Sequence, residues 1–285
     1  MKLGINIDHI ATLRNARMEG FPDILQYLEI VSKNANFVTI HLREDRRHIT
    51  DADALAICET NKKCFVNFEL GLNEEIVNIA VNLRPDAVCI VPEKREELTT
   101  ESGLNILNEI IFAKTQDAIK LFRQAGIRTS LFLDPNPSHA FMQALQALRP
   151  DAVEIHTGRF CYNFDAALHK ISPNFYSTLQ SAEAIFDFFA ANKQNLLRGE
   201  AGDNLLQINN FAAQLCKNGF EVHAGHGLKY LSLAALTAFT FPFANQFKIA
   251  EISIGHFIIA QSLLEGFGAV IAKIKFLTKF QSAVE

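Results

Sequence analysis

The feature that most constrains this chain is a set of eight short apolar runs, rich in Val, Ile and Phe, that recur along its length. Segments with the helical period of about 3.6 residues separate each run from the next. Apolar strands that alternate with amphipathic helices are typical of parallel β/α units, in which helices cover the sheet. The predicted strands span Lys2–Asn6, Phe37–Leu42, Cys64–Leu70, Asp86–Val91, Arg128–Asp134, Ala152–Thr157, Phe220–Gly225 and Ala250–Gly255.

Eight β/α units in 285 residues fit one α/β domain over residues 1–285, a (β/α)8 TIM barrel with additional helices. A doubly wound open sheet is the alternative, but the GxGxxG loop that would follow its first strand is missing. The segment 159–219 is longer than one helix requires and is rich in Phe. We therefore predict an enlarged helical segment there, with an inserted helix between strands six and seven that packs on the domain or on a neighbouring subunit.

Several joints between the predicted elements carry recognisable signals. Thr50 and Asp53 have the spacing of a capping box that opens a helix. Gly126 and Gly219 stand where helices should end before a strand. The motif LRPDAV occurs twice, at Leu83 and at Leu148, each time just before a predicted strand. We interpret the two copies as the same helix-to-strand joint.

Composition excludes several classes of protein. The net charge of −4 gives no general affinity for nucleic acid or for an anionic membrane, so any anion binding must be local. The five cysteines are widely spaced without a CxxC motif, which favours free thiols over a zinc site or disulfides. No apolar run reaches the roughly 18 residues of a membrane span, and the start of the chain does not read as a signal peptide. We predict a cytoplasmic protein.

Reactive residue types gather at one predicted edge of the barrel. In this fold the catalytic groups lie at the C-terminal ends of the strands and in the loops that follow. Six of the nine histidines fall at this rim, and only His139, His169 and His223 fall elsewhere. The residues at the predicted rim are Asn6, Asp8, His9, His41, Arg43, His48, Glu69, Glu93, Lys94, Arg95, Thr99, Asp134, Glu154, His156, His226, Gly255 and His256.

This rim suits proton transfer on small anionic molecules. Histidine and buried glutamate can both titrate near neutral pH, as general acid–base catalysis requires. Arginines supply bidentate contacts to phosphate or carboxylate groups. The arginines near the rim are Arg14, Arg17, Arg43, Arg46 and Arg47. The sequences AGHGLKY and SIGHFI place backbone amides at strand-to-helix joints, where barrels commonly hold a phosphate.

Simpler interpretations exist for several of these residues. The stretch HLREDRRHIT, taken alone, is also consistent with an exposed ion-paired turn. His223 points opposite to a rim position and is interpreted as structural, and Asp134 before Pro135 is interpreted as shaping a turn. Glu69 favours function, because an unpaired acid at a strand end is costly. No HxH or HExxH spacing occurs, so we predict no metal site.

Six motifs together resemble the pyridoxine 5′-phosphate synthase family of the deoxyxylulose-dependent vitamin B6 pathway. They are GINIDHIATLRNAR, HLREDRRHITD, VPEKREELTTESG, EIHTG, AGHGL and IGH, in order from the first strand to the last helix. The resemblance implies a (β/α)8 barrel with extra helices that assembles as a homo-oligomer, usually an octamer. It implies a ring-closing condensing enzyme of the transferase class. Its two phosphorylated substrates would be 3-amino-2-oxopropyl phosphate and 1-deoxy-D-xylulose 5-phosphate, with no metal or organic cofactor.

The resemblance also implies a role for each matching residue. His41 would be a general base, Glu69 a second proton acceptor and His226 a proton donor. Glu154 would stabilise charge in the transition state. The residues implied to hold the aminoketone phosphate are Asn6, Arg17, Gly227, Gly255 and His256. The residues implied to hold the deoxyxylulose phosphate are Asp8, His9, Arg43, His48 and Thr99. Within HLREDRRHIT, the remaining charges Glu44, Asp45, Arg46 and Arg47 would form an ion-paired frame.

The segment 159–219 departs from the family pattern, in which the path from HTG to the next rim histidine is shorter. This departure concerns subunit packing and any lid near strand six, and not the catalytic residues. Two rival functions stay open at this point. A phosphate-binding aldolase or isomerase is one, although a Schiff-base aldolase would need a lysine at a strand end and Lys94 is the only candidate. A nucleic-acid-binding protein that uses REDRRH is the other, and the interleaved acids argue against it.

Overall fold

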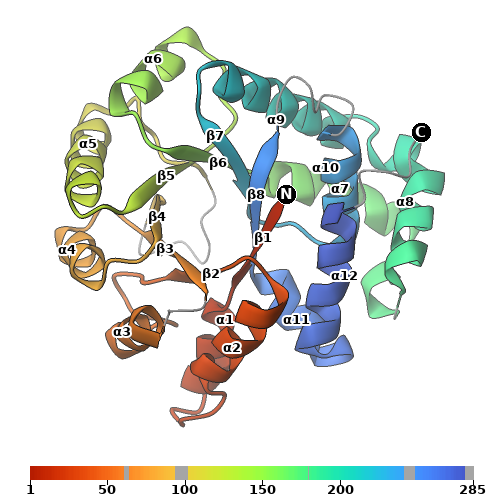
Figure 1. Cartoon of the computed structure of the whole chain (residues 1–285). Coiled ribbons are helices and arrows are strands. Elements are labelled where there is room, and N and C mark those ends of the chain that lie inside the picture. Colours follow the sequence, from red (N-terminus) through yellow and green to blue (C-terminus); the bar gives the residue numbers. More distant parts are fainter. Residues whose placement is uncertain (61–63, 94–101, 179, 241–247, 280–285) are drawn as a thin grey trace.

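The eight strands form one closed, entirely parallel barrel in chain order. The computed structural model describes residues 1–60, 64–93, 102–178, 180–240 and 248–279 (Figure 1). The predicted (β/α)8 barrel is confirmed, and the doubly wound alternative is wrong because β1 pairs with β8. The strands are β1 (Lys2–Asn6), β2 (Phe37–His41), β3 (Phe65–Leu70), β4 (Ala87–Ile90), β5 (Arg128–Leu133), β6 (Ala152–His156), β7 (Glu221–Gly225) and β8 (Ile249–Ile254).

Helices surround the barrel on its outer side (Figure 1). None of the described helices is long and apolar enough to cross a membrane. The helices are α1 (Asp8–Asn15), α2 (Ile24–Asn34), α3 (Asp51–Thr60), α4 (Glu74–Leu83), α5 (Glu109–Gln124), α6 (His139–Leu148), α7 (Gly158–Ile171), the 3-10 helix η1 (Phe175–Ser177), α8 (Ala182–Leu196), α9 (Glu200–Lys217), α10 (Tyr230–Thr240), α11 (His256–Glu265) and α12 (Phe267–Lys279).

The two faces of the strands differ in polarity. Outward residues such as Ile40, Phe68 and Ile252 are fully buried in one apolar core shared with the helices. Inward polar residues contact one another across the barrel, between strands that are not neighbours. Thr39 of β2 accepts a hydrogen bond from Ser253 of β8 at 3.1 Å. The inward polar residues include Thr39, His41, Asn67, Glu69, Ser130, Glu154, His156, His223, Glu251 and Ser253.

The two LRPDAV motifs build the same joint, as the sequence indicates. Arg84 ends α4 and Arg149 ends α6, and both adopt left-handed backbone conformations with φ of 49° and 51°. The aspartate that follows accepts a backbone N–H from the preceding strand of the barrel. Asp86 binds Val66 and Asp151 binds Thr129, each at 2.8 Å. In each motif the proline between the arginine and the aspartate cannot continue the helix. The repeated motif therefore both stops a helix and aligns the next strand.

A capping box fixes the start of α3, directly after the loop that carries His48. The Thr50 backbone N–H donates to Asp53 Oδ2 at 2.9 Å, and the Asp53 N–H donates to Thr50 Oγ1 at 3.2 Å. Arg14 of α1 donates to both Asp53 oxygens, at 2.6 and 2.8 Å. The carboxylate of Asp53 thereby ties α1 to α3 beneath the rim.

The segment 159–219 holds most of α7, then η1, α8 and α9, between β6 and β7. Helix α9 begins at Glu200, earlier than the polar residues up to Asn204 indicate, and Gly199 precedes it with a φ of 69°. Helices α7 and α9 pack against each other, whereas α8 packs against α10 and α12 outside the inner ring (Figure 1). We propose α8 as the inserted helix.

We predict that Asp53→Ala lowers the free energy of unfolding by about 2–3 kcal/mol, because it removes a helix cap and leaves Arg14 without its partner. Burial raises the pKa of the Asp53 carboxyl, but hydrogen bonds from Arg14 and Thr50 outweigh burial and hold that pKa below its usual value. The stabilisation is therefore complete above the unfolded-state pKa and is lost as the pH falls through the folded-state pKa.

Urea unfolding of wild type and variant between pH 8 and pH 4 measures this effect. The difference should stay constant down to about pH 5 and shrink below it. Asp117→Ala, at an exposed position on α5, is the matched control and should change stability by less than about 0.5 kcal/mol. An Asp53 variant as stable as this control would contradict the prediction.

Candidate active site

The C-terminal mouth of the barrel centres on His41, the last residue of β2. Its side chain is 7% exposed and lies between two carboxylates. Glu69 Oε2 is 4.0 Å from Nδ1, and Glu93 Oε2 is 3.7 Å from Nε2. Asp8 Oδ1 accepts the His41 backbone N–H at 2.9 Å, which fixes the strand end. An imidazole placed between two acids can give up or accept a proton with little movement.

Glu69 and Glu154 are inward residues of β3 and β6 that share the barrel interior. Burial, followed by the negative charges of Glu154 and Asp8, raises the pKa of Glu69 well above its usual value. Burial also raises the pKa of Glu154, despite the opposing charge of His223. Gly225 makes room for the Glu154 carboxylate, because a Cβ at this position would lie 2.1 Å from Oε1. Acids held in this way can carry a proton at neutral pH.

Glu93 follows β4, and its side chain is only 4% exposed. Its Oε1 accepts the backbone N–H of Glu44 at 2.8 Å and lies 3.6 Å from Arg43 Nε. Burial raises the pKa of the Glu93 carboxyl, but the adjoining His41, the Glu44 amide and Arg43 together lower it below its usual value. Glu93 is therefore the partner of His41 that is ionised at neutral pH, whereas Glu69 is the partner that can hold a proton.

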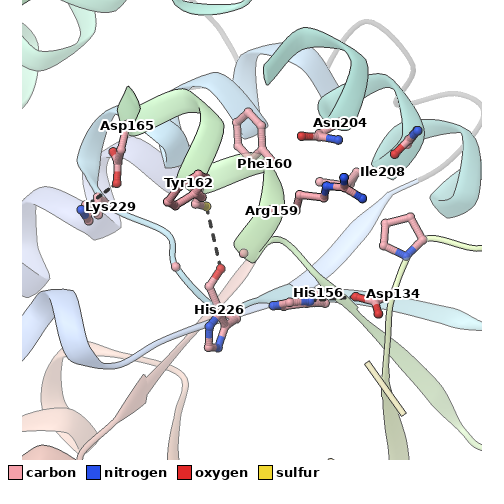
Figure 2. A pocket seen from close by; sticks show the side chains of 15 residues that line it. Asp134, His156, Arg159, Phe160, Tyr162, Asp165, Asn204, Ile208, His226 and Lys229 are labelled. Atoms are coloured by element: carbon pink, nitrogen blue, oxygen red, sulfur yellow. Dashed lines mark hydrogen bonds and ion pairs between the residues drawn. The ribbon is translucent and has the colours of Figure 1, made fainter. Parts of the chain in front are cut away.

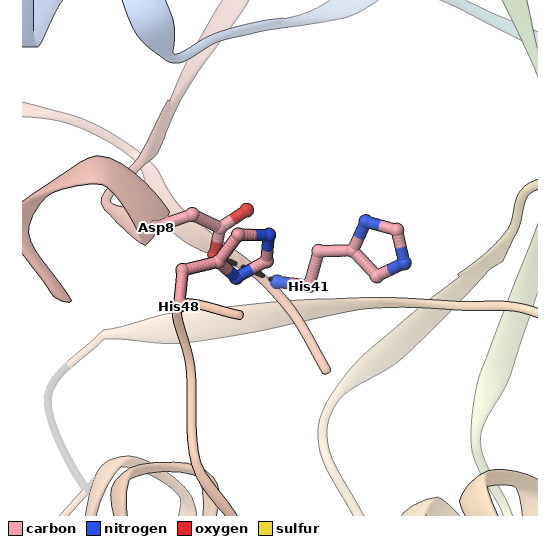
Figure 3. A group of neighbouring side chains, drawn as sticks. All are labelled: Asp8, His41 and His48. Atoms are coloured by element: carbon pink, nitrogen blue, oxygen red, sulfur yellow. Dashed lines mark hydrogen bonds between the residues drawn. The ribbon is translucent and has the colours of Figure 1, made fainter. Parts of the chain in front are cut away.

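Three further histidines, His9, His48 and His256, lie near His41 in a chain of neighbouring rings. Figure 3 shows His41 with His48 and with Asp8, the carboxylate next to them. The His48 ring centroid is 5.9 Å from that of His41 and 6.4 Å from that of His9. His9 in turn lies 4.9 Å from His256. Burial lowers the pKa of His48 and, together with His256, that of His9. Both rings are therefore largely neutral at pH 7.

This group presents N–H donors to the mouth of the barrel. His48 Nδ1 accepts the Ile49 backbone N–H at 2.9 Å, which places the proton of the neutral ring on Nε2. Asp8, His41 and His48 offer ligand atoms within 4.8 Å of one another, close enough for a metal ion. However, Asp8 Oδ1 is used by the His41 amide and Oδ2 by Asn6 Nδ2, at 2.9 and 2.8 Å. Asp8 thus serves first to hold the backbone of His41 and the side chain of Asn6.

A similar group lies at the opposite end of the barrel. Glu221, His223 and Glu251 also have ligand atoms within 4.8 Å of one another. Their carboxylates are already paired, Glu221 with Arg128 at 2.6 Å and Glu251 with Lys2 at 2.9 Å. His223 contacts Glu221 at 3.0 Å, in keeping with its interpretation as a structural residue.

The third group of rim residues borders a cavity of about 680 Å³ beside α7 and α9 (Figure 2). His156 ends β6 and His226 follows β7, and their ring centroids lie 4.9 Å apart. Thr157 ties the two loops together, because its Oγ1 hydrogen-bonds to the carbonyl oxygens of Gly225 and His226 at 2.7 and 2.6 Å. Burial, followed by the charge of His156, lowers the pKa of His226 to about 4. His226 is therefore neutral at pH 7.

The charged residues of HLREDRRHIT fall into a partly exposed, ion-paired set and a buried set. Arg47 pairs with Asp45 at 2.6 Å, and Arg46 pairs with Glu75 and with Asp51. Arg43 is buried, and its guanidinium lies near Asp45 and Glu93. The outer charges thus form ion pairs that hold the loop, whereas His41, Arg43 and His48 are buried.

The structure places the other predicted binding residues unequally. Asn6 lies beside Gly255, whose Cβ position would be 2.9 Å from Asn6 Cβ, and Gly227 lines the cavity. Arg17 is not brought to the mouth, because its side chain is 77% exposed and pairs with Glu19 at 3.1 Å. Thr99 lies outside the described residues, as do Lys94 and Arg95.

Two features of the site are not recognisable from the sequence. The sequence places Glu93 at the rim without a role, although it is the buried neighbour of both His41 and Arg43. The interpretation of Asp134 as a turn residue misses its contact with His156, whose Nδ1 lies 2.8 Å from Asp134 Oδ1. In both cases the partner comes from another strand, so only the position at a strand end could have pointed to it.

The fold and the mouth define the class of protein, a (β/α)8 barrel that gathers buried acids and histidines at the C-terminal ends of its strands. Residues 3–279 match the family described as "Pyridoxal phosphate biosynthesis protein PdxJ". The chain belongs to this family.

Relatives and solved structures agree with this assignment. The chain is 39% identical to the pyridoxine 5′-phosphate synthase of Pelagibacter ubique over 97% of this chain and 98% of that protein. It is 38% identical to the protein of the same name from Gluconobacter oxydans, with the same coverage. Among solved structures, the tryptophan synthase alpha subunit of Legionella pneumophila has a TM-score of 0.57 at 10% identity and covers 98% of this chain and 92% of that chain. This last similarity concerns the fold alone.

We predict that Glu69→Gln is more stable than wild type at pH 8 by about 1 kcal/mol or more, because the amide mimics the protonated acid. A carboxyl with a raised folded-state pKa binds its proton more tightly in the folded protein. Wild-type stability therefore falls as the pH rises from the unfolded-state pKa through the folded-state pKa. The two proteins should converge toward pH 4.5.

Urea unfolding at several pH values between 4.5 and 8 is the measurement. Glu59→Gln, at an exposed position on α3, is the control and should be neutral at every pH. A Glu69→Gln variant whose stability relative to wild type does not change with pH would show that Glu69 is an ordinary ionised acid.

Proposed function

We propose that this protein is a pyridoxine 5′-phosphate synthase. It condenses 3-amino-2-oxopropyl phosphate with 1-deoxy-D-xylulose 5-phosphate and forms pyridoxine 5′-phosphate, phosphate and water by general acid–base catalysis. The observation that carries this proposal is the placement of His41 between a protonatable acid, Glu69, and an ionised one, Glu93. Membership of the family and the names of its relatives support the choice of reaction.

The reaction needs several proton transfers around one pocket. An amine adds to a ketone, water leaves, phosphate is eliminated, and an aldol-type closure completes the aromatic ring. We assign His41 as the general base and Glu69 as a second proton acceptor once it has released its own proton. Glu154, which is also buried, is assigned to stabilise charge in the transition state. His226 is assigned as proton donor, which requires a supply of protons because its pKa is about 4.

Two phosphorylated substrates require two anion sites. We assign the deoxyxylulose phosphate to the side of the mouth formed by Asp8, His9, Arg43, His48 and Thr99. Support comes from the buried His48, whose neutral ring carries its proton on Nε2, and from the buried guanidinium of Arg43. We assign the aminoketone phosphate to Asn6, Arg17, Gly227, Gly255 and His256. For Arg17 this role requires its side chain to leave Glu19 and turn inward.

We also propose that the protein acts in the cytoplasm as a homo-oligomer, with an octamer as the expected form. Support comes from exposed apolar side chains on the helices, which include Leu263 and Leu264 of α11 at 76% and 60% exposure. No organic cofactor enters the proposed chemistry.

We predict that His41→Ala and Glu69→Gln each lower kcat by about 10²–10⁴-fold, because each removes a group that carries a proton. Purified protein is supplied with both substrates, and pyridoxine phosphate and released phosphate are followed together. His139→Ala, at the exposed start of α6, is the matched control and should retain wild-type kcat. Wild type that forms no product from active substrates would refute the proposed function. Near-normal turnover in either variant would refute the acid–base assignment alone.

We predict that exhaustive treatment with a chelator leaves kcat unchanged, since hydrogen bonds already occupy both Asp8 oxygens and His48 Nδ1. The same assay measures this result before and after dialysis against the chelator. Lost activity that returns with a divalent cation would contradict this prediction and reopen Asp8, His41 and His48 as metal ligands.

A further inference from the structure

Two groups at the mouth have no role in the proposed chemistry, Asp134 and His156. Asp134 follows β5, and its Oδ1 lies 2.8 Å from Nδ1 of His156 at the end of β6. Asp134 Oδ2 accepts the backbone N–H of Gly103 at 2.9 Å, so the carboxylate is held from both sides. The His156 side chain is only 6% exposed. A carboxylate anchored against a buried imidazole fixes the orientation of the ring and its tautomer.

This arrangement directs Nε2 of His156 toward the cavity. When Nδ1–H donates to Asp134, the lone pair of the neutral ring is on Nε2. That atom is buried and has no hydrogen-bond partner among the described residues. Gly158 keeps the space in front of it open, because a Cβ there would lie 2.5 Å from His156 Nε2 and 2.9 Å from His226 Cδ2. An unsatisfied buried nitrogen of this kind calls for a partner that comes from the cavity.

The two histidine rings face the same space. Their centroids are 4.9 Å apart at an interplanar angle of 69°, and Phe132 packs against both, at 5.0 and 6.2 Å. Both rings line the cavity of about 680 Å³, together with Asp134 and Arg159 (Figure 2). This volume lies within the usual range of a small-molecule site, about 300–1,000 Å³.

The titratable and charged groups around Asp134 and His156 come from four elements. Asp134 comes from the loop after β5, His226 from the loop after β7, Arg159 from α7, and Glu154 from β6, the strand that His156 ends. Burial raises the pKa of Asp134, but the hydrogen bonds from His156 and Gly103 and the charge of Arg159 outweigh burial and lower that pKa. Asp134 therefore stays ionised and can accept the Nδ1–H of His156. His226, with no carboxylate of its own in the described structure, has no comparable support.

We propose that Asp134 and His156 form the proton store that allows His226 to act as an acid, an inference that rests on the proposed function. His156 Nε2–H gives its proton to a water molecule in the cavity, and the same water gives one of its protons to His226. His226 then protonates the leaving hydroxyl group, which departs as water. His156 is left neutral beside ionised Asp134 and regains a proton from cavity water. His156 is thus a proton-relay residue, and Asp134 is the residue that positions it.

The test compares His156→Asn, Asp134→Asn and the control His139→Asn. In His156→Asn the new side-chain amide can still donate a hydrogen bond to Asp134, but it carries no transferable proton. We expect kcat of His156→Asn to fall about 100-fold while KM changes by less than about twofold. In Asp134→Asn the alkaline limb of the kcat–pH profile should move to lower pH, because the proton store loses its carboxylate. The control should match wild type in both measurements.

A second measurement does not depend on turnover. Nitrogen-15 NMR of labelled histidine reports the tautomer of His156 directly. The neutral ring should carry its proton on Nδ1 in wild type and should lose that preference in Asp134→Asn. A folded His156→Asn with wild-type kcat, or an unchanged tautomer in Asp134→Asn, would overturn the relay. A wild-type protein without synthase activity would refute the proposed function, and the NMR result would still decide whether the dyad exists.

Discussion

The structure depends on the burial of carboxylates inside a closed parallel barrel. Its outward face is apolar and forms the core with the helices, so the polar groups of the strands must point inward. Glu251 meets this constraint through ion pairs with Lys2 and Arg128, at the end away from the mouth. Glu69 and Glu154 form no ion pair with a lysine or arginine of the described chain. Burial instead raises their pKa, which favours the uncharged, protonated form inside the barrel. The cost of burying charge is thus offset by ion pairs at the end away from the mouth, and by raised pKa values of the acids at the mouth.

The upper end separates its histidines into two groups. His9, His41, His48 and His256 lie along one side, near the buried Arg43. The lowered pKa values of His9 and His48 leave these two rings largely neutral at pH 7. His156 and His226 lie on the other side, next to the cavity lined by α7 and α9. In the proposed reaction the first group would bind the phosphates and supply the general base, whereas the second group would relay protons to the leaving hydroxyl group.

Much of the fold could be predicted, because its signals are local. Strand periodicity, the Thr50 capping box and the helix ends at Arg84 and Arg149 each act within a few residues. The inward polar face was harder to see, because residues such as Thr39 and Asn67 find their partners only after the barrel closes. In the site, too, residues with a local signal could be predicted, whereas pairings between strands could not. His41 and Glu69 stand at strand ends and could be found, whereas the pairings of Glu93 with His41 and of Asp134 with His156 join separate strands. Arg17 shows the opposite case, a residue named from a motif that the structure leaves exposed beside Glu19.

The central claim is that a buried acid at the mouth holds a proton at neutral pH. Infrared spectroscopy measures this directly, through the carbonyl stretch of a protonated carboxylic acid in wild type and in Glu69→Gln at pH 7. The account predicts a protonated-acid band in wild type that is lost or reduced in the variant. Identical spectra in this region would show that Glu69 is ionised and would contradict the account.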